Sequence, residues 1–376
     1  LSHANERSAD RRLKIGYVSG DFNKHAVSHF IDPVLAQHDH ESYEIFCYFN
    51  HPVADEMTQH LQSYGGQWRM IAGLPDESVA QLIREDSIDI LVDLSGHTGE
   101  SRLLVFARKP APVQVTWLGY PNTTGLPTMD YRLTDGFADP PGLTEHLHTE
   151  QLVRLPESFS CFRALKKCPE VGELPLLKKG YPTFGSFNNP AKITPEVMRV
   201  WSKILLAVPG SRLMLKLLGA DNVALRQVVY DQFAALGIER ERLELLDAVG
   251  PHGEHLQRYN NIDIALDPFP YNGTTTNCDA LWMGVPVITL AGRTHVARVG
   301  TSQLSNLGLT ELIAHSLEDY VRIAVQLAQD PERLQTLRTG LRARMAASPL
   351  MDAARFTRHL EAAYRQMWQR WCETGA

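Results

Sequence analysis

The sequence predicts an α/β protein made of two doubly wound domains, each with a parallel sheet covered by helices. Short apolar runs of strand length alternate with amphipathic runs of helical length along most of the chain. One Pro-, Gly- and Lys-rich passage at residues 169–182 interrupts this alternation, which then starts again. A length of 376 residues is enough for two domains that each bury a core. Ligands of such domains bind at the carboxyl ends of the strands, so we expect a site in a cleft between the domains.

The first domain is predicted at residues 13–168, after a polar linker remnant at residues 1–12. It opens with the apolar run L-K-I-G-Y-V-S, which ends in a Gly20-Asp21 turn. Strands are expected at 13–19, 43–49, 88–94, 113–118, 131–133 and 152–155, with helices at 27–37, 77–85 and 102–108. Strands that alternate with helices imply parallel pairing through right-handed crossovers.

The second domain is predicted at residues 183–376, after the linker at 169–182. Strands are expected at 183–187, 212–218, 243–249, 262–266 and 286–290, with helices at 194–207, 223–236, 254–259, 277–283, 297–307 and 317–327. The tail from Pro331 onward is almost wholly helical, and an apolar stripe recurs every four residues at Phe356, Leu360, Tyr364 and Trp368. That stripe predicts core or interdomain packing.

The composition indicates an ordinary water-soluble enzyme of a reducing compartment, and we expect a cytoplasmic location. A net charge of -6 gives no general attraction to nucleic acid or to anionic membranes. The five cysteines are scattered without C-x-x-C spacing, which indicates neither a disulfide framework nor a zinc site. No apolar run is long enough to span a bilayer. Because the chain starts at Leu1 rather than Met, we expect it to be a fragment from which an upstream part was removed.

The stretch at residues 262–290 is the strongest candidate for a binding site, because it reads as strand, loop, helix, strand. Gly273, Thr274, Thr275 and Thr276 lead into the predicted helix, whose first N–H groups and partial positive charge suit a phosphate or diphosphate. Asp279, one turn inside, is placed to accept hydrogen bonds from a ribose. The alternative is that the threonines are ordinary N-caps and that Asp279 complements the helix dipole.

Other segments of the second domain supply further candidates for binding a diphosphate and a base. Lys192 closes N-N-P-A-K just after a strand, where an ammonium can neutralise a departing diphosphate; a solvated lysine is the alternative. His255 and Arg258 open a short helix and suit stacking on a base and reaching its carbonyls. No P-loop, no G-x-G-x-x-G after the first strand and no D-x-D occur, so we expect neither a cofactor nor a metal.

In the first domain, polar residues follow the ends of three strands. His25 suits proton transfer, or alternatively a weak metal pair with His29. Asp93 is either a general base or a structural hydrogen-bond acceptor. The remaining candidates on this edge are Ser95, His97, Tyr120, Pro121 and Thr123, in D-L-S-G-H-T-G and G-Y-P-N-T-T-G.

Five motifs in collinear order make nearly the whole chain resemble the catalytic region of the protein O-GlcNAc transferase and SPINDLY family. They are G-Y-V-S-G-D-F, D-L-S-G-H-T, R-K-P-A-P-V-Q-V-T-W-L-G-Y-P-N-T-T-G, G-S-F-N-N-P-A-K and P-Y-N-G-T-T-T-N-C-D-A-L-W-M-G-V-P. The resemblance implies a GT-B fold and inverting, metal-independent transfer of one sugar from a nucleotide sugar to Ser or Thr of proteins. It also implies upstream tetratricopeptide repeats that select the acceptors and that are absent from this fragment.

Carried over by position, the resemblance assigns roles to residues already singled out. At the donor phosphates, Lys192 matches the family lysine, and Thr275 and Thr276 match the pair of hydroxyls. Asn189 matches a further donor contact, Asp279 matches the carboxylate that binds the ribose, and His255 matches the residue stacked at the nucleotide. Arg258 matches an arginine near the base, and His25 matches a histidine on the acceptor side. The general base is left open between His25 and Asp93.

The donor sugar is the point at which the two branches of the family differ. Thr274 stands where O-GlcNAc transferases carry a histidine, and its surroundings resemble the SPINDLY branch, whose plant member uses GDP-fucose. Arg258 and Asp279 match the O-GlcNAc pattern, so UDP-GlcNAc is the preferred donor and GDP-fucose the alternative. A sugar-nucleotide-binding module without turnover and a sugar-nucleotide epimerase are the remaining hypotheses.

Overall fold

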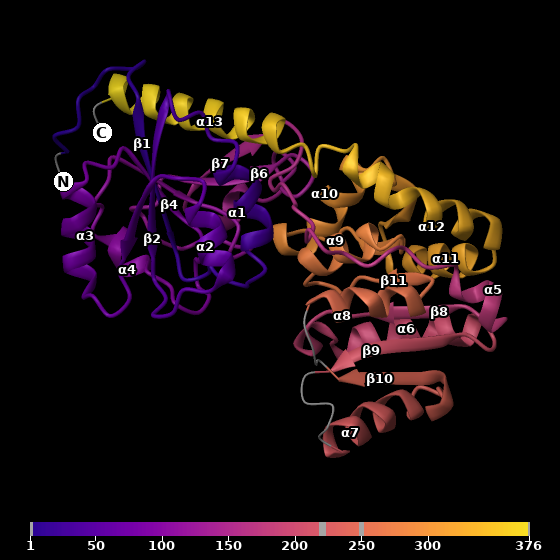
Figure 1. Ribbon diagram of the computed structural model, residues 1–376. Coiled ribbons are helices and arrows are strands. Elements are labelled where there is room, and N and C mark those ends of the chain that lie inside the picture. The colour runs from indigo at the N-terminus through magenta and orange to yellow at the C-terminus, as the bar shows by residue number, and fades with distance from the viewer. Residues whose placement is uncertain (1–2, 218–222, 248–251, 375–376) are drawn as a thin grey trace. The chain divides into compact units, whose positions relative to one another are not determined.

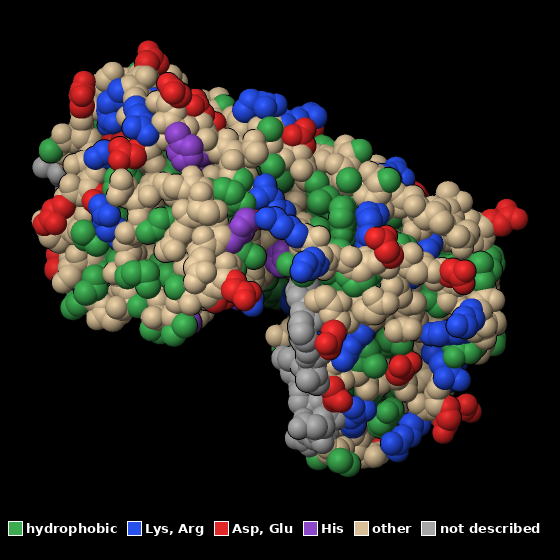
Figure 2. Space-filling model, in the orientation of Figure 1, with side chains coloured by type: hydrophobic (Ala, Val, Ile, Leu, Met, Phe, Trp, Pro, Cys, Tyr) green, Lys and Arg blue, Asp and Glu red, His purple; other side chains and the backbone are tan. Residues whose placement is uncertain are grey.

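The computed structural model of the chain describes residues 3–217, 223–247 and 252–374 (Figure 1). These residues form two compact units. Unit 1 comprises Leu1–Arg163 together with Pro349–Ala376, and unit 2 comprises Ala164–Ser348. Within the described residues, no helix combines the length and the apolarity that a bilayer crossing requires. Lys and Arg side chains are interspersed with Asp and Glu on the face shown in Figure 2, in keeping with the modest net charge.

Unit 1 is built on a seven-stranded sheet in the order β3-β2-β1-β4-β5-β6-β7, and all of its strand pairs are parallel. The strands are β1 (Leu13–Ser19), β2 (Tyr43–Phe49), β3 (Gln67–Met70), β4 (Ile90–Asp93), β5 (Val113–Thr116), β6 (Tyr131–Asp135) and β7 (Gln151–Leu155). The helices are α1 (Ser28–Leu35), α2 (Glu56–Gln62), α3 (Asp76–Glu85), α4 (Leu103–Ala107) and α13 (Ala353–Thr374), with a 3₁₀ turn η1 (Glu145–Leu147). The order reverses between β1 and β4, which is the switch point where doubly wound sheets bind ligands.

Alternation along β1 divides its side chains between two cores. Leu13, Ile15 and Tyr17 pack in a cluster that also contains residues of α1 and α13. Val18 packs in a second cluster, which contains residues of α3 and α4. Because both faces of the sheet are covered, its inner strands are apolar almost throughout, and this made them recognisable in the sequence.

The last part of the helical tail, Pro349–Ala376 with α13, belongs to unit 1, and this corrects the prediction that residues 183–376 form one domain. Residues 331–348 of the tail belong to unit 2, as predicted. The stripe of Phe356, Leu360, Tyr364 and Trp368 is buried in the same cluster as residues of β1. Figure 1 shows α13 running along unit 1. Glu361 strengthens this attachment, because its Oε1 accepts hydrogen bonds from His38 Nδ1 at 2.8 Å and from the backbone N of Asp39 at 2.9 Å. The periodicity predicts that the stripe is buried but does not identify the sheet that it covers.

Unit 2 is built on a six-stranded parallel sheet in the order β10-β9-β8-β11-β12-β13. The strands are β8 (Thr183–Ser186), β9 (Arg212–Leu217), β10 (Leu243–Asp247), β11 (Ile264–Leu266), β12 (Val287–Leu290) and β13 (Ile313–Ala314). The helices are α5 (Pro175–Lys179), α6 (Pro195–Ala207), α7 (Val223–Ala234), α8 (His252–Gln257), α9 (Thr275–Trp282), α10 (Val299–Asn306), α11 (Leu317–Ala328) and α12 (Pro331–Ala346). The 3₁₀ turns are η2 (Pro190–Lys192), η3 (Arg240–Arg242), η4 (Arg258–Asn261), η5 (His295–Ala297) and η6 (Thr310–Leu312). The predicted ends of two strands, at Leu218 and at residues 248–249, lie outside the described residues.

The predicted linker at 169–182 is part of unit 2, because its backbone is hydrogen-bonded to that unit. The N–H of Gly172 donates to Asn260 Oδ1 at 2.8 Å, and the N–H of Leu176, in α5, donates to Asp263 Oδ1 at 2.8 Å. Arg338 of α12 donates to the Gly172 carbonyl from the other side at 3.0 Å. The boundary between the units therefore falls at residues 163–164, a few residues earlier than expected.

Candidate functional site

The loop between β11 and α9 is fixed by a buried carboxylate. Asp267, 1% exposed, follows β11 directly, and its Oδ1 accepts a hydrogen bond from the Gly273 N–H at 2.6 Å. Its Oδ2 accepts another from Thr289 Oγ1 at 2.7 Å. Burial raises the pKa of Asp267 to about 6, although the bonds from Gly273 and Thr289 and the charge of Lys192 oppose the increase. The carboxylate therefore sets the path of the chain into the helix that follows.

Lys192 lies against this same loop, so it is not the solvated lysine of the alternative interpretation. Its Nζ donates to the carbonyl oxygen of Asn272 at 2.8 Å and lies 4.0 Å from the centre of the Tyr271 ring. Burial lowers the pKa of Lys192 to about 8, and the negative charge of Asp267 opposes that decrease. The structure thus brings the N-N-P-A-K segment to the turn that precedes α9, as the sequence predicts.

The start of α9 has the form expected of an anion-binding site. Thr274 occupies the N-cap position, but its side chain makes no capping hydrogen bond, which disfavours the ordinary N-cap interpretation for this residue. Thr275 and Thr276 begin the helix and are partly exposed, and the first turn contains no acidic residue. A side chain at Gly273 would clash, because its Cβ would lie 2.6 Å from Asn277 Oδ1. The start of the helix is therefore closely packed at Gly273 and carries partly exposed hydroxyls, a combination that suits an anion.

Asp279 is less accessible than the predicted contact with a ribose would suggest, and Arg258, although partly exposed, is hydrogen-bonded to the backbone. Asp279 is only 4% exposed, and its negative charge adds to the effect of burial in raising the pKa of Tyr259. Arg258 donates from Nη1 to the carbonyl of Asp247, at the end of β10. His255, from α8, packs in an aromatic group with ring centres 5.7 Å from Phe187 and 5.5 Å from Tyr259.

Two neighbouring side chains complete this region. Asn189 serves as the N-cap of η2, since its Oδ1 accepts from the Ala191 N–H at 3.0 Å. Lys216, near the end of β9, was missed in the sequence. Burial lowers the pKa of Lys216, while the charge of Asp279 opposes this and that of Arg258 adds to it. The available signal was a lysine inside the otherwise apolar strand L-M-L-K-L.

In unit 1, Asp93 has the structural role rather than that of a general base. It is 1% exposed, and its oxygens accept from the N–H groups of Ser95 at 3.1 Å and Gly96 at 3.0 Å and from Thr116 Oγ1 at 2.8 Å. Burial raises the pKa of Asp93, against the effect of these hydrogen bonds. A carboxylate whose acceptor sites are occupied in this way closes the turn after β4 and is poorly placed to take a proton from a substrate.

The loops after β4 and β5 pack tightly together and gather the acceptor-side candidates. Gly96 has φ +55°, and a Cβ there would lie 2.4 Å from Tyr120 Cβ, so only glycine fits. His97 Nε2 is 2.9 Å from the Thr124 carbonyl, and its ring meets that of Tyr120 edge-on at 5.2 Å. Pro121 and Thr123 are partly exposed in the same loop. The structure therefore places four of the predicted residues side by side.

His25 remains a candidate, whereas the metal pair with His29 does not. His25 Nδ1 lies 3.5 Å from Asp21 Oδ1, and its side chain is 48% exposed after β1. His29 turns instead to the Arg163 carbonyl at 3.0 Å and stacks on Phe162. Among the described residues, no group of three or more His, Cys, Asp or Glu side chains could hold a metal ion. That the candidates of the two units face each other across a cleft stays a prediction.

Comparisons with known proteins place these motifs in a family. The family described as glycosyl transferase family 41 matches residues 1–165 and 177–360. A protein from Oryza sativa subsp. japonica, named probable UDP-N-acetylglucosamine–peptide N-acetylglucosaminyltransferase SPINDLY, is 49% identical over 99% of this chain and 40% of its own length. The Arabidopsis thaliana protein with the same description but the name SEC is 35% identical over 96% of this chain and 38% of its own length. The chain thus spans about 40% of the curated relatives that it matches.

Solved structures confirm the fold. A mutant of the Thermobaculum terrenum O-GlcNAc transferase matches with a TM-score of 0.94 at 43% identity, over 100% of this chain and 71% of that chain. Anabaena Alr3699/HepE in complex with UDP and glucose matches with a TM-score of 0.59 at 11% identity, over 94% of this chain and 100% of that chain. The second likeness concerns fold alone. Together they confirm the two Rossmann-like domains of the GT-B fold.

Proposed function

The chain belongs to glycosyltransferase family 41, and we propose that it transfers a single N-acetylglucosamine from UDP-GlcNAc to Ser and Thr hydroxyls of proteins. The observation that carries the proposal is the Lys192 ammonium held at the Asn272 carbonyl, just before the open start of α9. A cation and a helix N-terminus at one place provide what a leaving diphosphate requires. The names of relatives that are 49% and 43% identical support the choice of sugar and acceptor.

The proposed reaction is a direct displacement with inversion. The acceptor oxygen bonds to the anomeric carbon as the bond from that carbon to the diphosphate oxygen breaks, and the acceptor proton passes to a base or to water. Lys192 and the α9 start stabilise the negative charge that grows on UDP, in place of a metal ion. His25 is the acceptor-side histidine. Asp93 already accepts hydrogen bonds from Ser95, Gly96 and Thr116, so either His25 or solvent takes the acceptor proton.

GDP-fucose is the second candidate donor. The chain is more similar to the SPINDLY protein than to the SEC protein, and Thr274 takes the place of the histidine of the O-GlcNAc branch. We further propose a cytoplasmic setting, because none of the five cysteines, each within the described residues, forms a disulfide. In the whole protein, upstream tetratricopeptide repeats would select the acceptors.

The test is transfer to an acceptor protein from each donor in turn, read by mass spectrometry of the modified peptides. We expect one N-acetylhexosamine per modified Ser or Thr with UDP-GlcNAc, at a rate that EDTA leaves unchanged. Transfer from GDP-fucose alone would refute the donor assignment, and loss of activity in EDTA that Mg²⁺ or Mn²⁺ restores would refute metal independence. If a donor binds in calorimetry but no sugar reaches any acceptor, the chain is a binding module; interconversion of the free sugar nucleotide would indicate an epimerase.

A further inference from the structure

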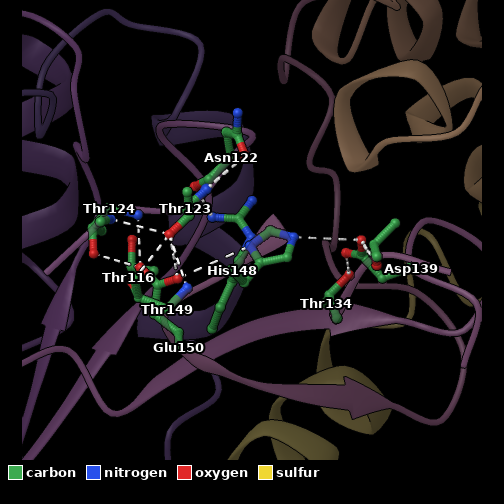
Figure 3. Close-up of polar contacts among 12 residues, drawn as sticks. Thr116, Asn122, Thr123, Thr124, Thr134, Asp139, His148, Thr149 and Glu150 are labelled. Carbon is green, nitrogen blue, oxygen red and sulfur yellow. Dashed lines mark hydrogen bonds and ion pairs between the residues drawn. The ribbon is translucent and has the colours of Figure 1, made fainter. Parts of the chain in front are cut away.

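A buried polar network lies beneath the loop at residues 120–125 of unit 1, which carries three of the acceptor-side candidates (Figure 3). Glu150, one residue before β7 and 4% exposed, contacts the loop with both carboxylate oxygens. Its Oε1 accepts from the Thr124 N–H at 2.6 Å and from the Thr124 hydroxyl, and its Oε2 accepts from the Thr123 hydroxyl at 2.7 Å. These hydrogen bonds lower the pKa of Glu150 although burial acts to raise it, so the carboxylate is ionised at neutral pH.

Arg132 holds the other half of the loop. It projects from β6, is 2% exposed, and donates from Nη1 to the carbonyls of Tyr120 at 3.1 Å and Asn122 at 2.7 Å. Burial lowers the pKa of Arg132, against the negative charges of Asp139, Glu150 and Asp93. The loop is therefore fixed by one buried anion at its hydroxyl and N–H groups and by one buried cation at its carbonyls.

A purely structural loop does not need such a network. Buried charges are costly to desolvate, and apolar residues of similar volume are often equally stabilising. What fixed hydrogen bonds provide here is one conformation for a loop in which Tyr120, Pro121 and Thr123 are partly exposed. The close contact of Gly96 with Tyr120 extends the same constraint to the loop after β4.

We infer that Glu150 and Arg132 are positioning residues that hold the 120–125 loop in the conformation that receives the acceptor protein. This inference rests on the proposed function, because it names the acceptor as the substrate that the loop contacts. The hydrogen bonds of both residues to this loop lie within unit 1, so their effect is expected on acceptor use alone.

The test compares Glu150→Gln with the matched control Glu145→Gln. Glu145 belongs to the same connection before β7 but pairs with Arg154 and accepts from the Gly142 N–H, away from the loop. With Glu150→Gln we expect the acceptor KM to rise roughly tenfold, because one oxygen that accepts from the loop becomes an amide donor. The KM for UDP-GlcNAc and the rate of donor hydrolysis should stay within about twofold of the unmodified chain, because the donor contacts are intact. The control should change none of these quantities.

Amide hydrogen exchange gives a readout that needs no activity. Residues 120–125 should exchange faster in Glu150→Gln than in the unmodified chain and the control, while α9 should not change. If the unmodified chain transfers no sugar, the proposed function fails. The positioning role is tested separately, because equal amide exchange rates at residues 120–125 in the variant and the control would overturn it. An unchanged acceptor KM, or an equal rise in both KM values, would overturn it as well. Should Glu150→Gln fail to fold, Thr123→Val removes one partly exposed hydroxyl of the same network and must raise the acceptor KM if the inference is correct.

Discussion

Replacing Asp267 by Asn is expected to raise the free energy of unfolding at pH 7 and to lower kcat/KM for the donor at alkaline pH. The carboxylate is buried, and its pKa rises from its usual 3.8 to about 6. At about 1.4 kcal/mol per pH unit, this difference corresponds to about 3 kcal/mol of folding free energy. Because the folded protein binds the proton more tightly than the unfolded chain, this stability is present below about pH 4 and is lost as the pH rises to about 6. At neutral pH the ionised Asp267 therefore lowers the stability of the wild type by this full amount.

The asparagine side chain of the variant does not titrate, so it does not cause this loss of stability as the pH rises. Its amide oxygen can still accept from the Gly273 N–H, and its NH₂ group can donate to the Thr289 hydroxyl. We expect a higher free energy of unfolding than the wild type at pH 7, by at most about 3 kcal/mol. Between about pH 4 and 6 the variant should lose less stability than the wild type. Urea unfolding at a series of pH values measures both.

Catalysis should change in the opposite direction, because Asp267 raises the pKa of Lys192 against the effect of burial. In the proposed mechanism Lys192 acts as a cation, so kcat/KM for the donor should fall as the pH rises through about 8 in the wild type. Without the Asp267 charge this decline should begin at lower pH. Asp263→Asn is the matched control, since Asp263 is a buried acid of the same sheet whose neighbouring charges are Arg338 and Lys179. A variant less stable than the wild type at pH 7, or an unmoved alkaline decline, would refute the reasoning.

Two further predictions test the tail and the donor region. Trp368→Ala should lower the free energy of unfolding of unit 1 by about 3–5 kcal/mol, as measured by urea unfolding. The reason is that the Trp368 side chain is fully buried and its indole N–H donates to the Ser8 carbonyl. A loss under about 1 kcal/mol would contradict the assignment of α13 to this core. His255→Ala should raise the donor KM about tenfold in steady-state assays, whereas His255→Phe should retain most of the affinity through stacking. Equal donor KM values for both variants and the wild type would exclude His255 from the nucleotide site.

The fold could be predicted where strands are buried on both faces. The runs at Leu13–Ser19 and Tyr43–Phe49 are apolar almost throughout and were predicted to the residue. The edge strand β3, Gln67–Met70, was missed because none of its residues is buried, so it carries no apolar run. The two-residue strand β13 is too short to leave a pattern. Helix α13 was assigned to the wrong unit because a helical stripe predicts burial but does not identify the surface that it packs against.

The candidate site could be predicted in its composition but not in its hydrogen bonding. Strand ends and helix starts located Lys192 and the threonines of α9, because those positions follow from the order of elements. The roles of Asp93, Asp267 and Glu150 depend on which backbone groups each carboxylate reaches. Glu150 meets Thr124 across 26 residues of sequence, a pairing that local patterns do not contain.

The central claim is that the Lys192 cation stabilises the departing diphosphate, and the single-turnover rate of Lys192→Met tests it most directly. Enzyme in excess over UDP-GlcNAc is mixed with saturating acceptor at pH 7, with Lys203→Met, an exposed lysine of α6, as the control. We predict a fall in the rate of sugar transfer of at least about 100-fold for Lys192→Met, with a melting temperature no lower than that of the wild type and an unchanged control. A rate within about threefold of the wild type would contradict the account, because the charge would then stabilise no part of the transition state.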